Sequence, residues 1–113
     1  MKKQYRLRKN WDFQRIIDNN KYVSNKYLVI YYAESSSFHA GITVPKKFEN
    51  AVGRNYNKRQ LKAIIHEIKI YDLNYDFVLI VRKDFIANDY ATKKQSIAKL
   101  FEKFRKNEKN KSF

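Results

Sequence analysis

The segment from about residue 52 to residue 70 constrains the fold more than any other part of the sequence. Apolar residues recur there at helical spacing and fall on one arc of a helix: Leu61, Ile64, Ile65 and Ile68. A second arc, roughly 100° wide, carries polar and cationic residues: Asn55, Lys58, Arg59 and Lys62. The sequence therefore predicts a long amphipathic helix with one buried and one charged face.

Patterns typical of β-strands lie on both sides of this helix. The run 27–32 is β-branched and aromatic, and the run 77–81 is continuously apolar, as in a strand that is central or covered on both faces. Residues 38–44 alternate, so Phe38 and its apolar partners form a core face. The other face carries only small or polar groups on which something else can lie, namely His39, Gly41 and Thr43.

Two further helices are predicted, one near each end of the chain. The first begins at Asn10 as its cap, and its buried stripe is Phe13, Ile16 and Ile17. The last begins at Asp89 as its cap, and its buried stripe is Ile97, Leu100, Phe101 and Phe104. The order helix, two or three strands, helix, strand, helix predicts an α+β fold, a two-layer α/β sandwich.

The chain is expected to form one domain over residues 1–113, because its two Gly and one Pro leave no flexible linker. Residues 1–9 form a basic arm. The charged tail, which begins at Arg105 and includes all of 106–113, is expected to fray.

Charge indicates the class of partner. Lys and Arg number 25 against 11 Asp and Glu, which gives a formal charge of +14 and indicates a polyanion binder. A membrane is the weaker candidate, because the apolar runs are short and no basic amphipathic helix lies at a terminus. A nucleic acid is therefore the expected partner. Without cysteine or an apolar signal region, the protein is expected in the cytoplasm.

The cations around the start of the long helix are the candidate RNA contacts. Acidic residues are absent from 51–65, and free backbone N–H groups at a helix start favour anions. The alternative is an ordinary solvated helix face. The candidate contacts are Lys46, Lys47, Arg54, Asn55, Lys58, Arg59 and Lys62, with Arg54 assigned to the cap region.

No residue of this chain is expected to be catalytic. His39 and His66 fit no catalytic pattern, although a stand-alone nuclease using either of them is an alternative. The pairs Asp72 with Asp76 and Asp84 with Asp89 are interpreted as caps and turn formers rather than metal ligands.

Aromatic residues supply a second candidate site. Phe13 and Tyr31 are predicted beside the sheet face that carries Gly41 and Thr43, where unpaired bases can stack. Ordinary core packing is the alternative interpretation of these rings.

Several motifs together resemble the bacterial ribonuclease P protein component family over nearly the whole chain. They are Leu7-Arg8-Lys9-Asn10, Asp12-Phe13-Gln14, Gly41-Ile42-Thr43-Val44-Pro45-Lys46-Lys47, Asn50-Ala51-Val52-Gly53-Arg54-Asn55 with Lys58-Arg59, and Phe77 to Lys83. The resemblance implies a left-handed βαβ crossover and a subunit that binds ribonuclease P RNA and precursor tRNA, with neither DNA nor a membrane as a partner. In that family the RNA, with Mg²⁺ bound mainly through it, removes the 5′ leader of precursor tRNA.

The resemblance also implies roles for particular residues. Arg54, Asn55, Lys58 and Arg59 match the motif that faces the catalytic RNA, and Phe13, Ile17 and Tyr31 match the leader-binding cleft, to which Thr43 is added. Two positions depart from the family: Tyr56 replaces a second Arg, and Ile17 replaces a common aromatic residue. The alternative function in the RNA-binding class is a structural module of the ribosome-associated kind.

Overall fold

The computed structural model describes residues 3–7 and 10–110, with side chains for residues 4–7 and 12–108. Its elements confirm the α+β class and the predicted order, and add a short strand and a short helix that were not predicted. In chain order they are the 3-10 turn η1 (Lys3–Tyr5), α1 (Asn10–Asp18), β1 (Tyr22–Ser24), β2 (Leu28–Glu34), β3 (His39–Thr43), α2 (Ala51–Ile68), β4 (Tyr75–Val81), α3 (Lys83–Ala87) and α4 (Tyr90–Asn110).

The four strands form one mixed sheet in the order β1-β2-β4-β3. Strand β4 is central, as its continuous apolar run predicted, and it pairs antiparallel with β2 and parallel with β3. Since β3 and β4 are parallel neighbours joined through α2, the chain contains a βαβ crossover. The crossover places the start of α2 beyond the end of β3.

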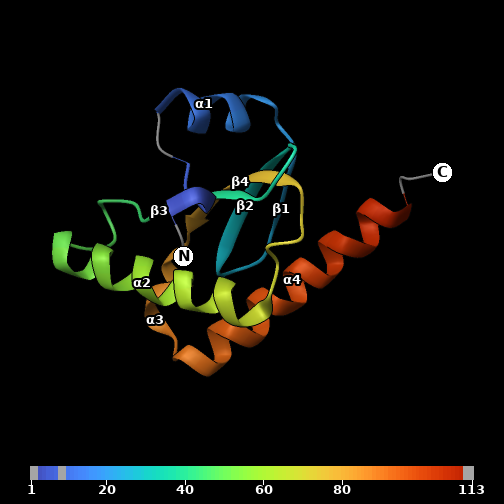
Figure 1. Ribbon diagram of the computed structural model, residues 1–113. Coiled ribbons are helices and arrows are strands. Elements are labelled where there is room, and N and C mark those ends of the chain that lie inside the picture. The colour runs from blue at the N-terminus through green and yellow to red at the C-terminus, as the bar shows by residue number, and fades with distance from the viewer. Residues whose placement is uncertain (1–2, 8–9, 111–113) are drawn as a thin grey trace.

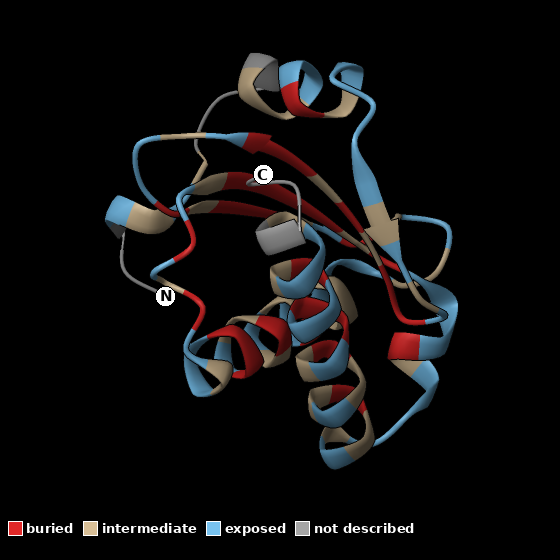
Figure 2. Ribbon diagram, turned by 90° about the vertical axis from the view of Figure 1, so that its right-hand side faces the viewer, coloured by how far each residue is buried: buried red, intermediate tan, exposed pale blue. Residues whose placement is uncertain are grey.

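Helices cover the two faces of the sheet unequally (Figure 1). Helices α2 and α4 lie on one face, and the short α1 lies over the other. The buried residues of the strands and of α2 and α4 face one another and form the main core (Figure 2). A second, smaller cluster of Ile16, Ala33 and Val78 lies between α1 and the sheet.

Local interactions explain where α2 begins and ends. Asn50 is its N-cap, and the Asn50 side chain accepts a hydrogen bond of 2.9 Å from the Gly53 N–H. At the other end Lys69 adopts the left-handed conformation, with φ of 54°, which stops the helix. Leu61, Ile64 and Ile65 are fully buried, which confirms the predicted apolar arc.

The N-terminal segment and the last helix are held more firmly than predicted. Residues 3–7 of the predicted arm pack on the domain: the Leu7 N–H donates to Ala40 O at 3.1 Å, and the Tyr5 ring stacks on Tyr71 at 4.5 Å. Residues 1–2 and 8–9 of the arm lie outside the described residues, as does the Asn10 side chain predicted to be a cap. The predicted cap at Asp89 is confirmed, because its carboxylate accepts from the Thr92 N–H at 2.8 Å.

The segment from Arg105 to Asn110, predicted as a fraying tail, is the last part of helix α4 in the structure. Two contacts hold its last turns. Arg105 donates two hydrogen bonds of 2.8 Å to Asp72, and the Tyr75 hydroxyl donates to Glu108 at 2.7 Å. The last three residues, 111–113, lie outside the described part of the chain.

The interpretation of Asp76 as a turn former is also wrong. Asp76 lies within β4 and is only 8% exposed. Its carboxylate accepts a 2.7 Å hydrogen bond from Arg15 of α1, and its other oxygen lies 2.8 Å from Nδ1 of His39. A buried carboxylate needs such partners, so Asp76 joins α1 to the sheet.

Candidate RNA interface

The ring of Phe13 lies directly on the backbone of Gly41. A Cβ atom at Gly41 would come within 2.5 Å of Cε1 of that ring and closer still to Cζ. The absence of a side chain at Gly41 therefore allows α1 to approach β3. At Gly41, the small-residue face of β3 is covered by α1 of the chain itself.

The predicted leader-cleft residues gather between α1 and the sheet. Phe13, Ile17 and Tyr31 are half-buried and pack around the small cluster beneath α1. Thr43 is exposed at the end of β3. The Tyr31 ring lies 5.3 Å from the ring of Tyr22, its cross-strand partner on β1, and Tyr22 is 53% exposed. Partly exposed rings at the surface, such as that of Tyr22, can stack on unpaired bases.

Cations of α2 meet this aromatic group at a small cavity of about 160 Å³. Lys58 and Lys62 of α2, Arg6 of the N-terminal segment, and Phe13 with Gly41 all line it. Burial, and then the nearby charges of Arg6, Lys58 and Arg59, lower the pKa of Lys62. A phosphate placed here would relieve that repulsion, so the cavity has the electrostatics of an anion site.

The other predicted RNA contacts lie in the first turns of α2 and in the turn before it. Asn55 and Arg59 are exposed, whereas the Arg54 guanidinium donates to Glu49 O at 3.1 Å, which confirms its assignment to the cap region. Lys46 and Lys47 are exposed in the turn before the helix, and Lys47 Nζ lies 5.2 Å from the Phe48 ring centre.

A chain of hydrogen bonds holds Tyr56 on the outer face of α2. The Gln60 amide donates to the Tyr56 hydroxyl oxygen at 2.8 Å, and Lys93 of α4 donates to the Gln60 oxygen at 2.6 Å. Lys93 is only 2% exposed, and burial lowers its pKa, with Asp89 opposing that effect. Because the Tyr56 oxygen accepts from Gln60, its own O–H remains able to donate to a phosphate oxygen.

Sequence reasoning missed three residues at these sites: Arg6, Tyr22 and Gln60. Arg6 reaches the cavity through pairing with Ala40, a segment distant in sequence, and Tyr22 lies in a strand of three residues, too short to show a pattern. Gln60 lies four residues after Tyr56, and this helical spacing was a signal that could have found it.

The histidines and carboxylates are arranged for structural contacts. His39 lies against Asp76 as described above, and His66 Nδ1 lies 3.4 Å from the Tyr71 hydroxyl. Within residues 3–7 and 10–110, no group of three or more His, Asp or Glu side chains is placed to hold a metal ion.

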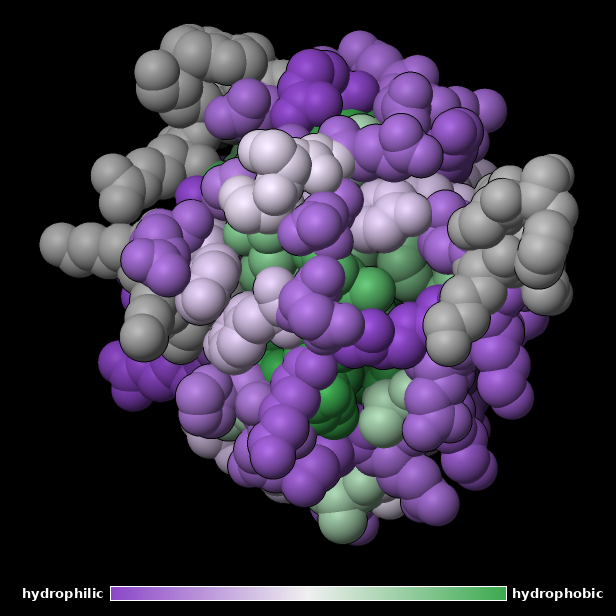
Figure 3. All heavy atoms as spheres, turned by 45° about the vertical axis from the view of Figure 1, so that its right-hand side comes forward, coloured by the Kyte–Doolittle hydropathy of each residue, from purple (hydrophilic) through white to green (hydrophobic). Residues whose placement is uncertain are grey.

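The surface is mostly hydrophilic on the face shown in Figure 3, with a smaller hydrophobic area visible between the polar residues. Among the described residues, no helix has the length and apolar character needed to cross a bilayer.

Comparison with known proteins agrees with this geometry. A family model described as Ribonuclease P matches residues 1–105. The chain is 54% identical to the ribonuclease P protein component of Mycoplasmopsis synoviae over 110 residues, which cover 96% of this chain and 98% of that relative. It is 48% identical to that of Mycoplasmopsis pulmonis over 112 residues, covering 98% and 100% of the two chains.

Solved structures show the same fold. The RNase P protein of Staphylococcus aureus superposes with a TM-score of 0.79 at 32% identity, covering 87% of this chain and 93% of that one. The RNase P protein of Thermotoga maritima gives a TM-score of 0.76 at 29% identity, covering 84% and 93%. With a family model over residues 1–105 and these relatives over nearly its full length, the chain belongs to the ribonuclease P protein component family.

Proposed function

We propose that this protein is the RNA-binding subunit of a cytoplasmic ribonuclease P holoenzyme that removes the 5′ leader of precursor tRNA. The observation that carries the proposal is the cavity where Lys58, Lys62 and Arg6 lie beside Phe13. Phosphate-binding cations and an aromatic cleft meet there, as a protein that holds a single strand next to a larger RNA requires.

The outer face of α2 is proposed to contact ribonuclease P RNA. Asn55 and Arg59 are exposed on it, and Lys58 and Lys62 extend it towards the cleft. Arginine can contact a phosphate through two N–H groups at once, whereas lysine provides a point charge. We propose that Arg59 orients the RNA strand and that the lysines neutralise its charge.

The cleft beneath and beside α1 is proposed to hold the unpaired leader of precursor tRNA. The rings of Tyr31 and Tyr22 lie side by side across neighbouring strands and provide a stacking surface. Phe13 is fixed on Gly41, so it is proposed to form a wall of the cleft. Base stacking tolerates any sequence, which suits leaders that differ between tRNAs.

Hydrolysis is proposed to belong to the RNA, with Mg²⁺ held mainly by the RNA. The protein would place its cations near the phosphates and reduce the repulsion between two RNA molecules. The alternative of a ribosome-associated RNA-binding module predicts instead that the purified protein enriches ribosomal RNA over ribonuclease P RNA.

Salt dependence of binding tests the α2 face. Replacing Lys58 or Arg59 with Ala should weaken binding to a ribonuclease P RNA transcript and reduce the log–log salt slope by about 0.7–0.9 for each phosphate that the protein no longer neutralises. Lys106→Ala is the control, because it removes one exposed charge from α4 outside these sites. If the α2 variants behaved like Lys106→Ala, the proposed RNA face would be wrong.

Substrate preference tests the cleft. Tyr31→Ala and Tyr22→Ala should weaken binding of precursor tRNA by the reconstituted holoenzyme, by about 1–3 kcal/mol for each base that no longer stacks, and leave mature tRNA binding nearly unchanged. An equal effect on both RNAs would assign these rings to packing. Cleavage by RNA-free protein that disappears in His39→Ala would instead establish the stand-alone nuclease.

A further inference from the structure

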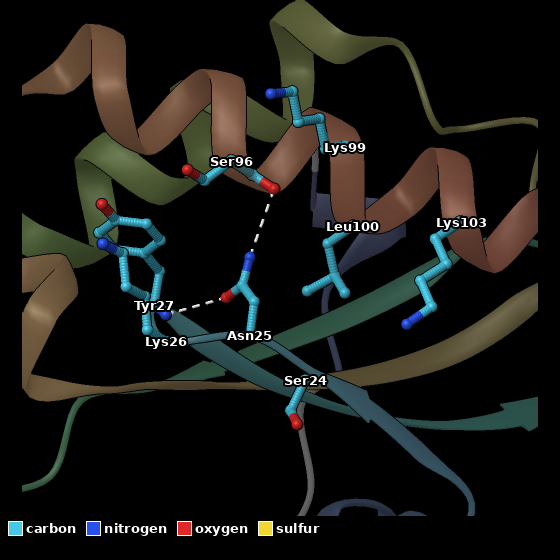
Figure 4. A pocket seen from close by; sticks show the side chains of 8 residues that line it. All are labelled: Ser24, Asn25, Lys26, Tyr27, Ser96, Lys99, Leu100 and Lys103. Atoms are coloured by element: carbon cyan, nitrogen blue, oxygen red, sulfur yellow. Dashed lines mark hydrogen bonds between the residues drawn. The ribbon is translucent and has the colours of Figure 1, made fainter.

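We propose a second RNA-binding site, a phosphate-binding pocket between the β1–β2 turn and α4. The pocket has a volume of about 300 Å³. Three lysines and an apolar floor define it, namely Lys26, Lys99, Lys103, Tyr27 and Leu100, and Asn25 frames it (Figure 4). Its proposed occupant is one nucleotide unit of an RNA strand, with the phosphate at the lysines and the sugar on the floor.

The shape of this pocket is fixed by Asn25. The Asn25 side-chain oxygen accepts from the N–H groups of Tyr27 and Leu28 at 2.9 and 3.0 Å, and its amide donates to the Ser96 carbonyl of α4 at 3.3 Å. Arg82 also donates to the Asn25 carbonyl at 2.8 Å. The turn and the helix are therefore joined, and a ligand would bind without first having to order the turn.

The charge of the pocket is positive and uncompensated. Lys99 and Lys103 are exposed one helical turn apart, where like charges repel. Neither has an ion-pair partner within the part of the chain that the structure describes, and no carboxylate lines the pocket. Lys26 Nζ lies 5.2 Å from the centre of the Tyr27 ring, so its charge also stays near the opening. An anion between these lysines would remove the repulsion.

The floor and the size indicate what accompanies the phosphate. Leu100 is 5% exposed and Tyr27 3% exposed, so they offer an apolar surface within a polar rim. The volume is at the low end of the range for ligand pockets, about 300–1,000 Å³, which suits a single nucleotide unit better than a peptide segment. Charge complementarity and this size together favour a nucleic acid strand as the occupant.

The position of the pocket separates it from the proposed α2 contacts, and it lies on the α4 side of the sheet, whereas Tyr31 packs on the α1 side. The pocket adjoins β1, at one edge of the sheet, whereas the cavity with Lys58 and Lys62 adjoins β3, at the other edge. A strand in the pocket must therefore be a different segment of RNA from one bound at the α2 face. The choice of RNA as the polymer rests on the proposed function.

A footprinting experiment tests occupancy without changing charge. The chain has no cysteine, so Ser96→Cys places a unique thiol on the α4 side of the pocket lining, and Ser36→Cys places one on an exposed turn as the matched control. Saturating ribonuclease P RNA transcript should slow alkylation at Ser96→Cys by about tenfold or more, since access governs thiol reactivity, and leave Ser36→Cys nearly unchanged. Equal alkylation rates with and without RNA at Ser96→Cys would show that the pocket does not bind RNA.

A charge-removal experiment separates the pocket from diffuse attraction along α4. The double variant Lys99→Gln with Lys103→Gln should reduce the log–log salt slope by about 1.4, or about 0.7 for each contact with a single strand, and Lys106→Gln should reduce it far less. If Lys106→Gln reduced the salt slope as much per charge removed as the double variant does, the result would contradict a defined pocket. If Arg59→Ala reduced the slope and the double variant did not, the pocket proposal would be wrong while the proposed function stood. No effect from any of these variants would refute both.

Discussion

The contact between Phe13 and Gly41 gives the sharpest test of how the cleft is built. In Gly41→Ala the new methyl group would overlap the Phe13 ring, so the ring must move by about 1.5 Å to restore ordinary van der Waals contact. Overpacking of this kind costs about 1–3 kcal/mol, and about 1.5 kcal/mol is expected because the half-buried ring can shift. Replacing a strand glycine by alanine by itself stabilises the fold by about 0.5 kcal/mol.

The net expectation for Gly41→Ala is a decrease of about 1 kcal/mol in the free energy of unfolding. In a Phe13→Ala background the overlap is gone, so the same substitution should raise stability by about 0.5 kcal/mol. The effect of Gly41→Ala on the free energy of unfolding therefore changes sign between the two backgrounds, and the coupling energy between positions 13 and 41 should be about 1.5 kcal/mol.

Urea unfolding of the wild type, the two single variants and the double variant measures this coupling directly. The free energy of unfolding should fall with urea concentration at the same slope in all four proteins, so that differences between their unfolding midpoints report differences in stability alone. If Gly41→Ala cost the same in both backgrounds, the contact would not be the reason that glycine is needed. Precursor tRNA binding by Gly41→Ala should fall as well, because the displaced ring no longer forms the same wall.

Three further outcomes are expected. Tyr56→Phe should weaken binding to ribonuclease P RNA because the donor held by Gln60 is removed, whereas Tyr56→Arg should strengthen binding and steepen the log–log salt slope by about 0.7–0.9. Hydrogen bonds from Arg105 lower the pKa of Asp72. The Asp72 carboxylate therefore stabilises the fold above the ordinary pKa of an aspartate, and this stabilisation is lost as the pH falls. In an acid titration, Asp72→Asn should show a smaller decrease in stability below about pH 4 than the wild type. Asp76→Asn should lower stability by about 1–3 kcal/mol in thermal unfolding, because it weakens the link between α1 and the sheet, whereas a neutral result would make that link unimportant.

The long elements were predictable because their patterns are local. The stripe of Leu61, Ile64 and Ile65 and the cap at Asn50 define α2, and the continuous apolar run of β4 indicates a central strand. The alternation in β3 also predicted correctly that Gly41 faces away from the main core. In each case the residues that decide the structure are close in sequence.

Some features that were missed are too short to show a pattern, and others depend on partners distant in sequence. Strand β1 has only three residues, Tyr22–Ser24, too few to show alternation, and it pairs with the next strand, β2. Asp76 looked like a turn residue because its partners, Arg15 and His39, are 61 and 37 positions away. The helical end of α4 likewise depends on Asp72 and Tyr75, which sequence periodicity in the tail cannot report.

The bridge between Arg6 and Ala40 has a consequence for the solution behaviour of the protein. Strand β3 is at the edge of the sheet, and the N-terminal segment pairs with it in parallel and covers part of that edge. Uncovered edge strands offer unpaired backbone groups to other molecules and promote association. A shortened chain that starts after residue 7 would expose this edge, so the segment that brings a cation to the RNA cavity would also protect the monomer from edge-to-edge aggregation.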